Sequence, residues 1–381
     1  MREAVLMLYG EYQTIDENEE ILGHPDQEDM FHDRPDLENR FAENGIAFHI
    51  GRVLEKPGGR RELGNPPRIE VAQNPIYDER GTLLPETVFE EDSLENYPAV
   101  IDHWVANFQD RVPQADGSTL RTAYGLGVPN ERLWNSYPVQ YMANSKLLMD
   151  AVLVESGVGI PTYTMDRLDE LVQDHPQVQI FYKPVDGSLS KGTEQFQRPE
   201  DVRQALAEKR IASSGILQPY LDLTSAITTL RAPEDNASAA QKLAHVNTRD
   251  NRLREVRMHT LTYTDEQGNL QVEAYPTLKY SHPDTPVMKR AGCVELDPDS
   301  VDPALYAITQ DLGRSVVQTA RMHTNEPVTQ YYGTVDWVKD KQGRWYCIDI
   351  NCRGPRLTVE SPLARAAFTN VLSYNVWQNL Q

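Results

Sequence analysis

The run YGTVDWVKDKQGRWYCIDINCRGPR, from Tyr332 to Arg356, constrains the fold more than any other stretch of the chain. Aromatic and β-branched residues alternate with polar ones over Thr334–Val338 and again over Trp345–Ile350. A cluster of Asp, Lys, Gln and Gly separates these two runs, which is typical of the turn between paired strands. The sequence therefore predicts a β-hairpin with its turn over residues 340–343.

Three oxygen-bearing side chains of this hairpin are expected to converge. Because side chains alternate along a strand, Asp349 and Asn351 share one face, and Ile348 and Ile350 share the other. Asp336 lies on the partner strand, where pairing across the turn brings its carboxylate near Asp349. Two carboxylates and one carboxamide form an all-oxygen site. Such a site suits Mg²⁺, which keeps some waters and takes other ligands from substrate phosphates. Asp336, Asp349 and Asn351 are therefore the candidate metal ligands.

The residues around these ligands admit two interpretations. Arg353 and Arg356, just after the hairpin, could hold an anionic substrate or stabilise developing phosphate charge. The simpler alternative is a surface hairpin whose aspartates are solvated and whose aromatic residues pack inward. Asp349 stands between two isoleucines, and a charged residue on a mostly buried strand needs a partner. That position favours the metal site.

The acidic charge of the whole chain narrows its partners. With 381 residues, the chain is long enough for two or three domains, each with its own core. Its formal net charge is −20, whereas non-specific binding to nucleic acid or to an anionic membrane depends on clustered Lys and Arg. We therefore expect no nucleic-acid and no membrane partner, and a small-molecule or other soluble ligand instead.

Cysteine usage and the N-terminus point to the compartment. Cys293, Cys347 and Cys352 are too few for a disulfide framework and lack the spacing of zinc ligands, so we expect reduced thiols that are buried or near the site. The opening MREAVLMLYG lacks the apolar core and cleavage site of a signal peptide, and no apolar run reaches membrane-spanning length. We expect a cytoplasmic protein.

Apolar periodicity predicts an α/β chain in which strands and helices alternate. Strands are expected at 4–9, 46–50, 99–101, 179–183, 215–221, 255–263 and 270–275. Helices are expected at 35–44, 145–155, 199–210, 302–325 and 362–377. The early β-α-β rhythm indicates a small parallel sheet. Residues 55–96, rich in Gly, Pro, Glu and Asn, and residues 224–251 are expected to be loops or insertions.

Two lysines and one loop are candidates to bind phosphate. Lys146 lies in the first turn of a predicted helix, where a cation is unfavourable to the helix dipole unless an anion binds there too. A solvated lysine fits the pattern equally well. Lys183 ends a predicted strand. The loop DGSLSKGT that follows, residues 186–193, offers backbone amides and the charge of Lys191 to an oxyanion. A plain turn is the simpler interpretation of this loop, which has no Walker spacing.

Two later stretches could contact other parts of a nucleotide or substrate. Pro219 interrupts the strand GILQPYL at 215–221, and the N–H and C=O groups freed there could pair with an adenine edge. Period two over 255–263 places three polar side chains on one face: Glu255, Arg257 and His259. A basic patch follows, made of Lys279, Lys289 and Arg290, which an acidic chain tolerates more readily beside an anionic ligand.

With these pieces in this order, the chain resembles the ATP-grasp superfamily of carboxylate–amine ligases, such as D-alanine–D-alanine ligase and glutathione synthetase. Asp336, Asp349 thirteen residues later, and then Asn351 match the family pattern of an acidic residue followed by acidic-x-Asn, although glutamate is commoner at the second position. The resemblance covers residues 135–356. It implies an α/β (α+β) ATP-grasp fold with a preceding α/β domain at 1–133, a central subdomain at 134–215 and a C-terminal subdomain with the metal site at 216–381.

The resemblance also implies roles for individual residues. The implied nucleotide-binding residues are Lys146, Lys183, Gly187, Ser188, Ser190, Lys191, Gly192, Gln218, Tyr220, Leu221 and Asp222. The implied substrate-binding residues are Arg257, Lys289, Arg290, Arg353 and Arg356, with Arg257 and Arg353 also catalytic. Two departures from the family stand out: Asn144-Ser145 replaces the usual acidic residue before the first lysine, and Gln218-Pro219 replaces an acidic pair at the adenine contact.

The chemistry implied by the resemblance is the joining of a carboxylate to an amine at the expense of ATP, with Mg²⁺, or alternatively Mn²⁺, as the metal. The carboxylate would attack the γ-phosphorus to give an acyl phosphate, and an amine would then displace phosphate. An amino acid or short peptide is the expected substrate, and a homodimer is compatible with the family. The alternatives are a small-molecule kinase of the same fold and a non-catalytic nucleotide-binding protein.

Overall fold

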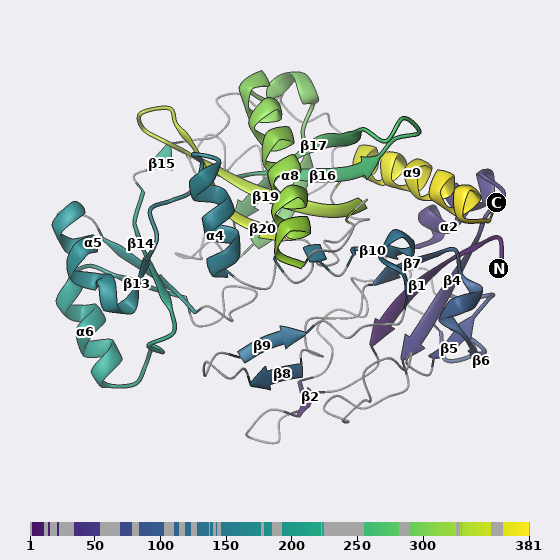
Figure 1. The fold of residues 1–381 in the computed structure, drawn as a ribbon, viewed down its shortest axis with the longest axis horizontal. Coiled ribbons are helices and arrows are strands. Elements are labelled where there is room, and N and C mark those ends of the chain that lie inside the picture. Colours follow the sequence, from purple (N-terminus) through teal and green to yellow (C-terminus); the bar gives the residue numbers. More distant parts are fainter. Residues whose placement is uncertain are drawn as a thin grey trace, which may run out of the picture.

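The structure, a computed structural model, describes most of the chain. The described residues are 2–10, 14–15, 21–22, 34–53, 69–77, 84–102, 110–113, 119–122, 128–136, 138–139, 142, 146–176, 179–184, 193–221, 223–224, 255–281, 290–324, 328, 330–351 and 361–380. Three sheets with their helices lie side by side, and both chain ends lie beside the N-terminal sheet (Figure 1).

The N-terminal sheet has six strands in the order β10-β7-β1-β4-β5-β6. Their bounds are β1 Ala4–Gly10, β4 Ala47–Val53, β5 Ile69–Ala72, β6 Glu90–Asp92, β7 Ala99–Asp102 and β10 Leu133–Trp134. The first four strands in that order are parallel, as predicted, but β5 and β6 pair antiparallel. Those two strands correct the expectation of loops throughout 55–96. Ile69 and Val71 of β5 are buried between β4 and β6, so three or four residues suffice for these strands although Pro and Gly surround them.

The central sheet is small and antiparallel, in the order β11-β14-β12-β13. Its strands are β11 Tyr163–Thr164, β12 Ile180–Lys183, β13 Glu194–Phe196 and β14 Ile216–Pro219. Two helices, α5 Leu168–Asp174 and α6 Pro199–Ala207, cover one face, and side chains from both helices and the sheet form a compact apolar cluster. The predicted strand at 215–221 ends at Pro219, which has no amide proton to extend the ladder.

The C-terminal sheet contains the predicted hairpin. Its strands run in the order β15-β19-β16-β17-β18, and β20 pairs with β19. Their bounds are β15 Leu223–Thr224, β16 Glu255–Thr264, β17 Leu270–Ser281, β18 Arg290–Glu295, β19 Gln330–Asp340 and β20 Trp345–Asn351. Two short ribbons, β2 Thr14–Ile15 with β3 Ile21–Leu22 and β8 Asp110–Pro113 with β9 Thr119–Thr122, lie outside the three sheets.

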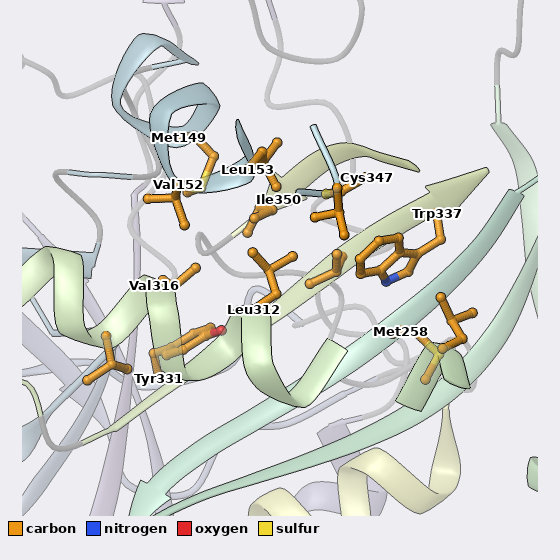
Figure 2. Close-up of a cluster of buried hydrophobic side chains, with 14 of the residues drawn as sticks. Met149, Val152, Leu153, Met258, Leu312, Val316, Tyr331, Trp337, Cys347 and Ile350 are labelled. Carbon is orange, nitrogen blue, oxygen red and sulfur yellow. The ribbon is translucent and has the colours of Figure 1, made fainter. Parts of the chain in front are cut away.

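Helices cover both faces of the C-terminal sheet. The predicted helices are confirmed as α2 Arg34–Glu43, α4 Lys146–Glu155, α6, α8 Pro303–Thr324 and α9 Pro362–Leu380. On one face, α4 and α8 bury a core against the hairpin, to which α4 contributes Met149 and α8 contributes Val316 (Figure 2). The expected division at residues 133 and 215 stays a prediction. Two elements nevertheless pack across the expected boundaries. Helix α4, expected in the central subdomain, packs into the C-terminal core, and β14, expected in the C-terminal subdomain, pairs within the central sheet.

The second face of the C-terminal sheet meets the N-terminal sheet across α9. Phe368 of α9 packs edge-on against Trp134 with ring centroids 5.1 Å apart, and against Tyr332 at 5.4 Å. Asn135, directly after β10, donates a hydrogen bond to the carbonyl of Tyr332 and accepts one from its amide, each at 2.6 Å. These contacts fasten the N-terminal sheet to β19.

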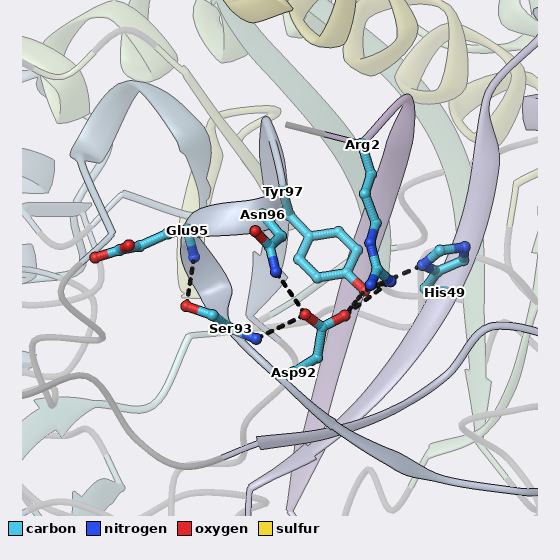
Figure 3. Close-up of polar contacts among 7 residues, drawn as sticks. All are labelled: Arg2, His49, Asp92, Ser93, Glu95, Asn96 and Tyr97. Atoms are coloured by element: carbon cyan, nitrogen blue, oxygen red, sulfur yellow. Dashed lines mark hydrogen bonds and ion pairs between the residues drawn. The ribbon is translucent and has the colours of Figure 1, made fainter.

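A buried polar network lies inside the N-terminal part (Figure 3). The Tyr97 hydroxyl donates to Asp92 Oδ2 at 2.8 Å and lies 3.1 Å from His49 Nδ1. Since its one proton goes to the carboxylate, the Tyr97 oxygen accepts from His49, whose Nδ1 therefore carries the imidazole proton. Arg2 contacts both Tyr97 and Asp92. Burial, and then the Arg2 cation, lower the pKa of His49.

This network predicts a loss of stability in mild acid. Because the pKa of His49 lies below 6.5 in the folded protein, the unfolded chain binds a proton there first. The free energy of unfolding is expected to fall as the pH drops below about 6.5 and to keep falling until the folded pKa is passed. Urea denaturation at several pH values checks this, with His49→Gln as the non-titrating control. An equally steep loss in that variant would exclude His49 as the cause.

Candidate functional site

The predicted hairpin is confirmed, and it places the two aspartates opposite each other on paired strands. Asp336 of β19 pairs directly with Asp349 of β20, and Thr334 pairs with Asn351. Side chains opposite each other in such a pair have Cβ atoms about 4.5–5.5 Å apart. The turn holds Gly343 at a φ of 85°, a conformation that favours glycine. Each strand therefore contributes part of one oxygen-rich patch.

A β-bulge changes which side chains of β20 face the core. The register shifts next to Asp336, so that Trp337 pairs with Cys347 and Ile348 has no directly opposite residue. Cys347 and Ile350 are buried in the core, while Ile348 is only half-buried. The expectation that Ile348 and Ile350 share the inner face is therefore wrong, because the extra residue breaks period two. Asp349 is exposed, so it does not sit on a buried strand face as we expected.

The two aspartates differ sharply in environment. Asp336 is only 1 % exposed, and both of its oxygens accept hydrogen bonds from Arg257, at 2.7 Å from Nε and 2.9 Å from Nη2. Arg257 lies directly opposite Asp336 on β16. A carboxylate offers about four lone-pair positions, so the two hydrogen bonds from Arg257 do not by themselves use all of them. Arg257 thus holds this carboxylate in place, and its expected contact with substrate stays a prediction.

Lys183 of the central sheet reaches the same hairpin. Its ammonium donates to the carbonyl of Ile348, the bulged residue, at 3.2 Å. Burial lowers the pKa of Lys183, while the nearby carboxylate of Asp349 acts in the opposite direction. Burial also raises the pKa of the Cys347 thiol well above its usual range, and both aspartates add to that shift. A phosphate-binding candidate and a metal-binding candidate therefore lie together beside a neutral thiol.

The strand end at β14 offers fewer backbone groups than expected. The amide of Tyr220 already donates to the carbonyl of Gln179 at 2.6 Å, so it is not free for an adenine edge. Gln218 is 8 % exposed, and its amide donates to the hydroxyl of Thr162 at 2.9 Å. Leu221 is half-buried after the strand.

Other polar groups extend the patch along β16. His259 Nδ1 lies 2.6 Å from the hydroxyl of Tyr332. Burial raises the pKa of this phenol, and the nearby Arg257 and Arg365 only partly offset that increase. Arg365, in the first turns of α9, is 7 % exposed. Sequence reasoning placed His259 on this face but missed Arg365, because nothing in the helical pattern of α9 brings it near β16.

Several predicted site residues lie outside the described part of the chain. They are Gly187, Ser188, Ser190, Lys191, Gly192, Asp222, Lys289, Arg353 and Arg356. Lys146 begins α4, Lys279 lies on β17 and Arg290 on β18, but their side chains are outside the description. The insertion expected at 224–251 lies beyond β15, also outside the description apart from Thr224. The roles of all these residues stay predictions.

The donor set suits a hard cation. Within the described ranges, no group of three or more His, Cys, Asp or Glu side chains could hold a metal ion. The hairpin offers two carboxylates and the Asn351 carboxamide, an oxygen set that leaves positions for phosphate and water. A Cβ on Gly333 would lie 2.9 Å from the Asn351 carbonyl, so glycine there allows β20 to approach closely.

Two further observations concern other parts of the molecule. A polar surface groove of about 590 Å³ lies elsewhere, between α9 and the turn after β16, where Asp265, Glu266 and Tyr374 line it. In the described part of the chain, no helix is long and apolar enough to cross a membrane.

Comparison with solved structures shows the fold. A D-cycloserine synthetase superposes with a TM-score of 0.51 at 15 % identity, covering 98 % of this chain and 99 % of that one. D-alanyl-alanine synthetase A from Vibrio cholerae O1 biovar eltor gives 0.52 at 13 % identity, covering 100 % and 98 %. The D-alanine–D-alanine ligase from Coxiella burnetii gives 0.51 at 11 % identity, covering 99 % and 93 %. No protein-family model and no curated protein matches the chain.

The likeness therefore shows that the chain has the ATP-grasp fold. The α/β assignment with several sheets is confirmed. At identities of 11 to 15 % the likeness establishes architecture only.

Breaking the Arg257–Asp336 pair is expected to destabilise the protein strongly. Arg257→Met leaves a buried carboxylate without its cation, which costs about 3–5 kcal/mol in comparable cases. Urea denaturation measures the change in the free energy of unfolding. The matched control is Arg314→Met. Arg314 forms an ion pair of 2.7 Å with Asp311, and both side chains are exposed. Loss of this exposed pair should cost about 0–1 kcal/mol. Similar losses in both variants would contradict the importance of the buried pair.

Proposed function

We propose that the chain is an ATP-dependent carboxylate–amine ligase. The observation that carries the proposal is the meeting of Lys183 with the Asp336–Asp349 hairpin, which joins a phosphate-binding cation to an oxygen-rich metal site. The two synthetases and the ligase with the same fold support this proposal, because two of the three are named for D-alanyl-alanine or for D-alanine joined to D-alanine.

The metal site would act through charge. Asp336, Asp349 and Asn351 would hold Mg²⁺, which when bound supplies positive charge to the phosphates of ATP. Arg257 would keep the Asp336 carboxylate oriented toward that ion, since partners behind a metal ligand fix its geometry. Lys183 would exchange its hydrogen bond to the Ile348 carbonyl for one to a phosphate oxygen.

The residues of the site would position reactants and need supply no covalent nucleophile. The carboxylate of one substrate would attack the γ-phosphorus in line, forming an acyl phosphate and releasing ADP. An amine would then attack the acyl carbon and expel phosphate, giving an amide. Positioning and charge stabilisation account for the catalysis. Cys347 would take no part, because its thiol is buried and stays protonated.

Substrate class and compartment follow the same proposal. We infer an amino acid or short peptide as substrate, which the resemblance supports, and a cytoplasmic location, which the cysteine usage described above supports. Arg353 and Arg356, which follow the hairpin in sequence, would contact the acyl substrate.

The proposal predicts phosphate release that needs two substrates and the hairpin. Phosphate is measured from Mg·ATP with a panel of amino acids and short peptides, singly and in pairs. A carboxylate and amine pair should stimulate release and yield a condensed product. Asp349→Ala should lower the rate on the order of 100-fold or more, since it removes a charge-stabilising group.

The control for this experiment is Asp299→Ala, which changes an exposed aspartate in the short 3-10 turn before α8, outside the candidate site, and should retain full activity. A phosphorylated product that accumulates without an amine would identify a kinase instead. If Mg·ATP does not bind at all, the proposal is wrong.

A further inference from the structure

A polar groove of about 590 Å³ lies beside α9, at the end of β16 and the start of β19. Glu131, just before β10, lines it together with Gln330 of β19 and Tyr374 of α9. Its volume falls within the range of about 300–1,000 Å³ that is usual for small-molecule sites, which often lie where separate parts of a protein meet. The groove is thus large enough for a small organic ligand.

The groove is separate from the candidate metal site, although both lie along the same two strands. Gln330 pairs with Tyr263 beside the groove, whereas Asp336 pairs with Arg257 at the hairpin. Six residues of strand, about 20 Å, separate these two places. A small ligand in the groove therefore does not touch the hairpin.

Hydrogen bonds fix the orientation of the carboxamides in the groove. The Gln330 side chain is buried, and its Nε2 donates to the backbone carbonyl of Glu131 at 2.9 Å. A backbone carbonyl can only accept, so the nitrogen end of Gln330 points to Glu131 and its oxygen end is left for Asn375. Asn375 donates to that oxygen from Nδ2 at 2.5 Å. In the same way, Asn379 donates from Nδ2 to the carbonyl of Pro98 at 3.0 Å.

Asn375 and Asn379 consequently leave their oxygen ends to the groove, which both residues line. Each donates from nitrogen to another group of the protein, and within the described ranges no hydrogen bond reaches the side-chain oxygen of either residue. They stand one helical turn apart on the same face of α9, a spacing that places Cβ atoms about 5–6 Å apart. Helix α9 thus presents two fixed acceptors in a row.

The charge of the groove is negative. The carboxylates of Glu131, Asp265 and Glu266 line it, and none of the described lining residues is Lys, Arg or His. Burial, and then the Glu266 and Asp265 carboxylates, raise the pKa of the Tyr374 hydroxyl. Asp265 already accepts a hydrogen bond of 2.8 Å from the amide of Asn269 in its own turn, so it acts mainly through its charge. A matching ligand is positively charged and donates hydrogen bonds.

An extended organic cation suits these acceptors better than a metal ion does. A metal ion draws its ligands to within about 2.0–2.6 Å of one point. Within the described ranges, no group of three or more His, Cys, Asp or Glu could hold a metal ion in this way. The acceptors are instead spread over one turn of α9 and the segments beside it. Ammonium groups separated by methylene groups can reach several of them at once.

We propose that the groove binds an organic cation with two or more amino groups, of which the linear polyamines are the simplest. Its ammonium groups pair with the carboxylates of Glu131 and Glu266 and donate to the side-chain oxygens of Asn375 and Asn379. The inference does not depend on the proposed function, because no residue of the groove belongs to the hairpin.

Spermidine is the probe that tests this inference. Its dissociation constant is measured by titration calorimetry at about 0.15 M salt, where long-range attraction to the acidic chain is screened. One spermidine should bind per chain, and a straight-chain diol of the same length should not bind. Glu266→Gln removes one exposed carboxylate and should weaken binding roughly 5-fold. Asn379→Leu removes an acceptor but no charge, and should weaken binding roughly 10-fold.

Two further variants are controls. Asp311→Asn removes an exposed carboxylate on α8, outside the groove, and should leave the dissociation constant unchanged. Asp349→Ala changes the hairpin and should also leave it unchanged. No saturable binding by the wild type would overturn the inference. Equal weakening by Asp311→Asn and Glu266→Gln would overturn it as well, because the probe would then associate with the acidic surface in general. Loss of binding in Asp349→Ala alone would place spermidine at the hairpin, against the inference.

Discussion

The ion pair between Arg257 and Asp336 organises the candidate site. It joins β16 to β19 on the polar face of the C-terminal sheet, while the opposite face of the same strands packs against α4 and α8. A buried carboxylate without a cation would be strongly unfavourable. The guanidinium holds Asp336 in place across from Asp349. The geometry of the hairpin and the chemistry proposed for it both depend on this pair.

Each aspartate of the hairpin has its own nearby cation. Arg257 binds Asp336, and Lys183 lies close to Asp349, which is also exposed to water. Two carboxylates side by side would otherwise repel each other and favour protonation of one. The protein thus compensates both charges with groups from β16 and the central sheet. Under the proposed function, a divalent ion held by the two aspartates would compensate their charge and leave Lys183 available to a phosphate.

Much of this architecture could be predicted from the sequence, because the hairpin, the long helices and β16 have strong periodic patterns. The bulge at Ile348 could not be predicted, since one unpaired residue leaves the local pattern almost unchanged while reversing which side chains face the core. The partners of Asp336 and Gln218 were also missed. Arg257 and Thr162 reach them from strands and segments far away in sequence, and residue patterns carry no information about such distances.

The contacts of Asn135 with Tyr332 have a consequence for motion. They join the N-terminal sheet to the C-terminal sheet beside α9, where the Phe368 ring packs edge-on against Trp134 and at a tilt against Tyr332. The central sheet meets β20 through Lys183, which donates to the carbonyl of Ile348, and the segment before β11 meets it where the Cys347 amide donates to the carbonyl of Val158. Any movement of the central sheet relative to the C-terminal sheet would therefore have to break contacts made by β20, the strand that also carries Asp349.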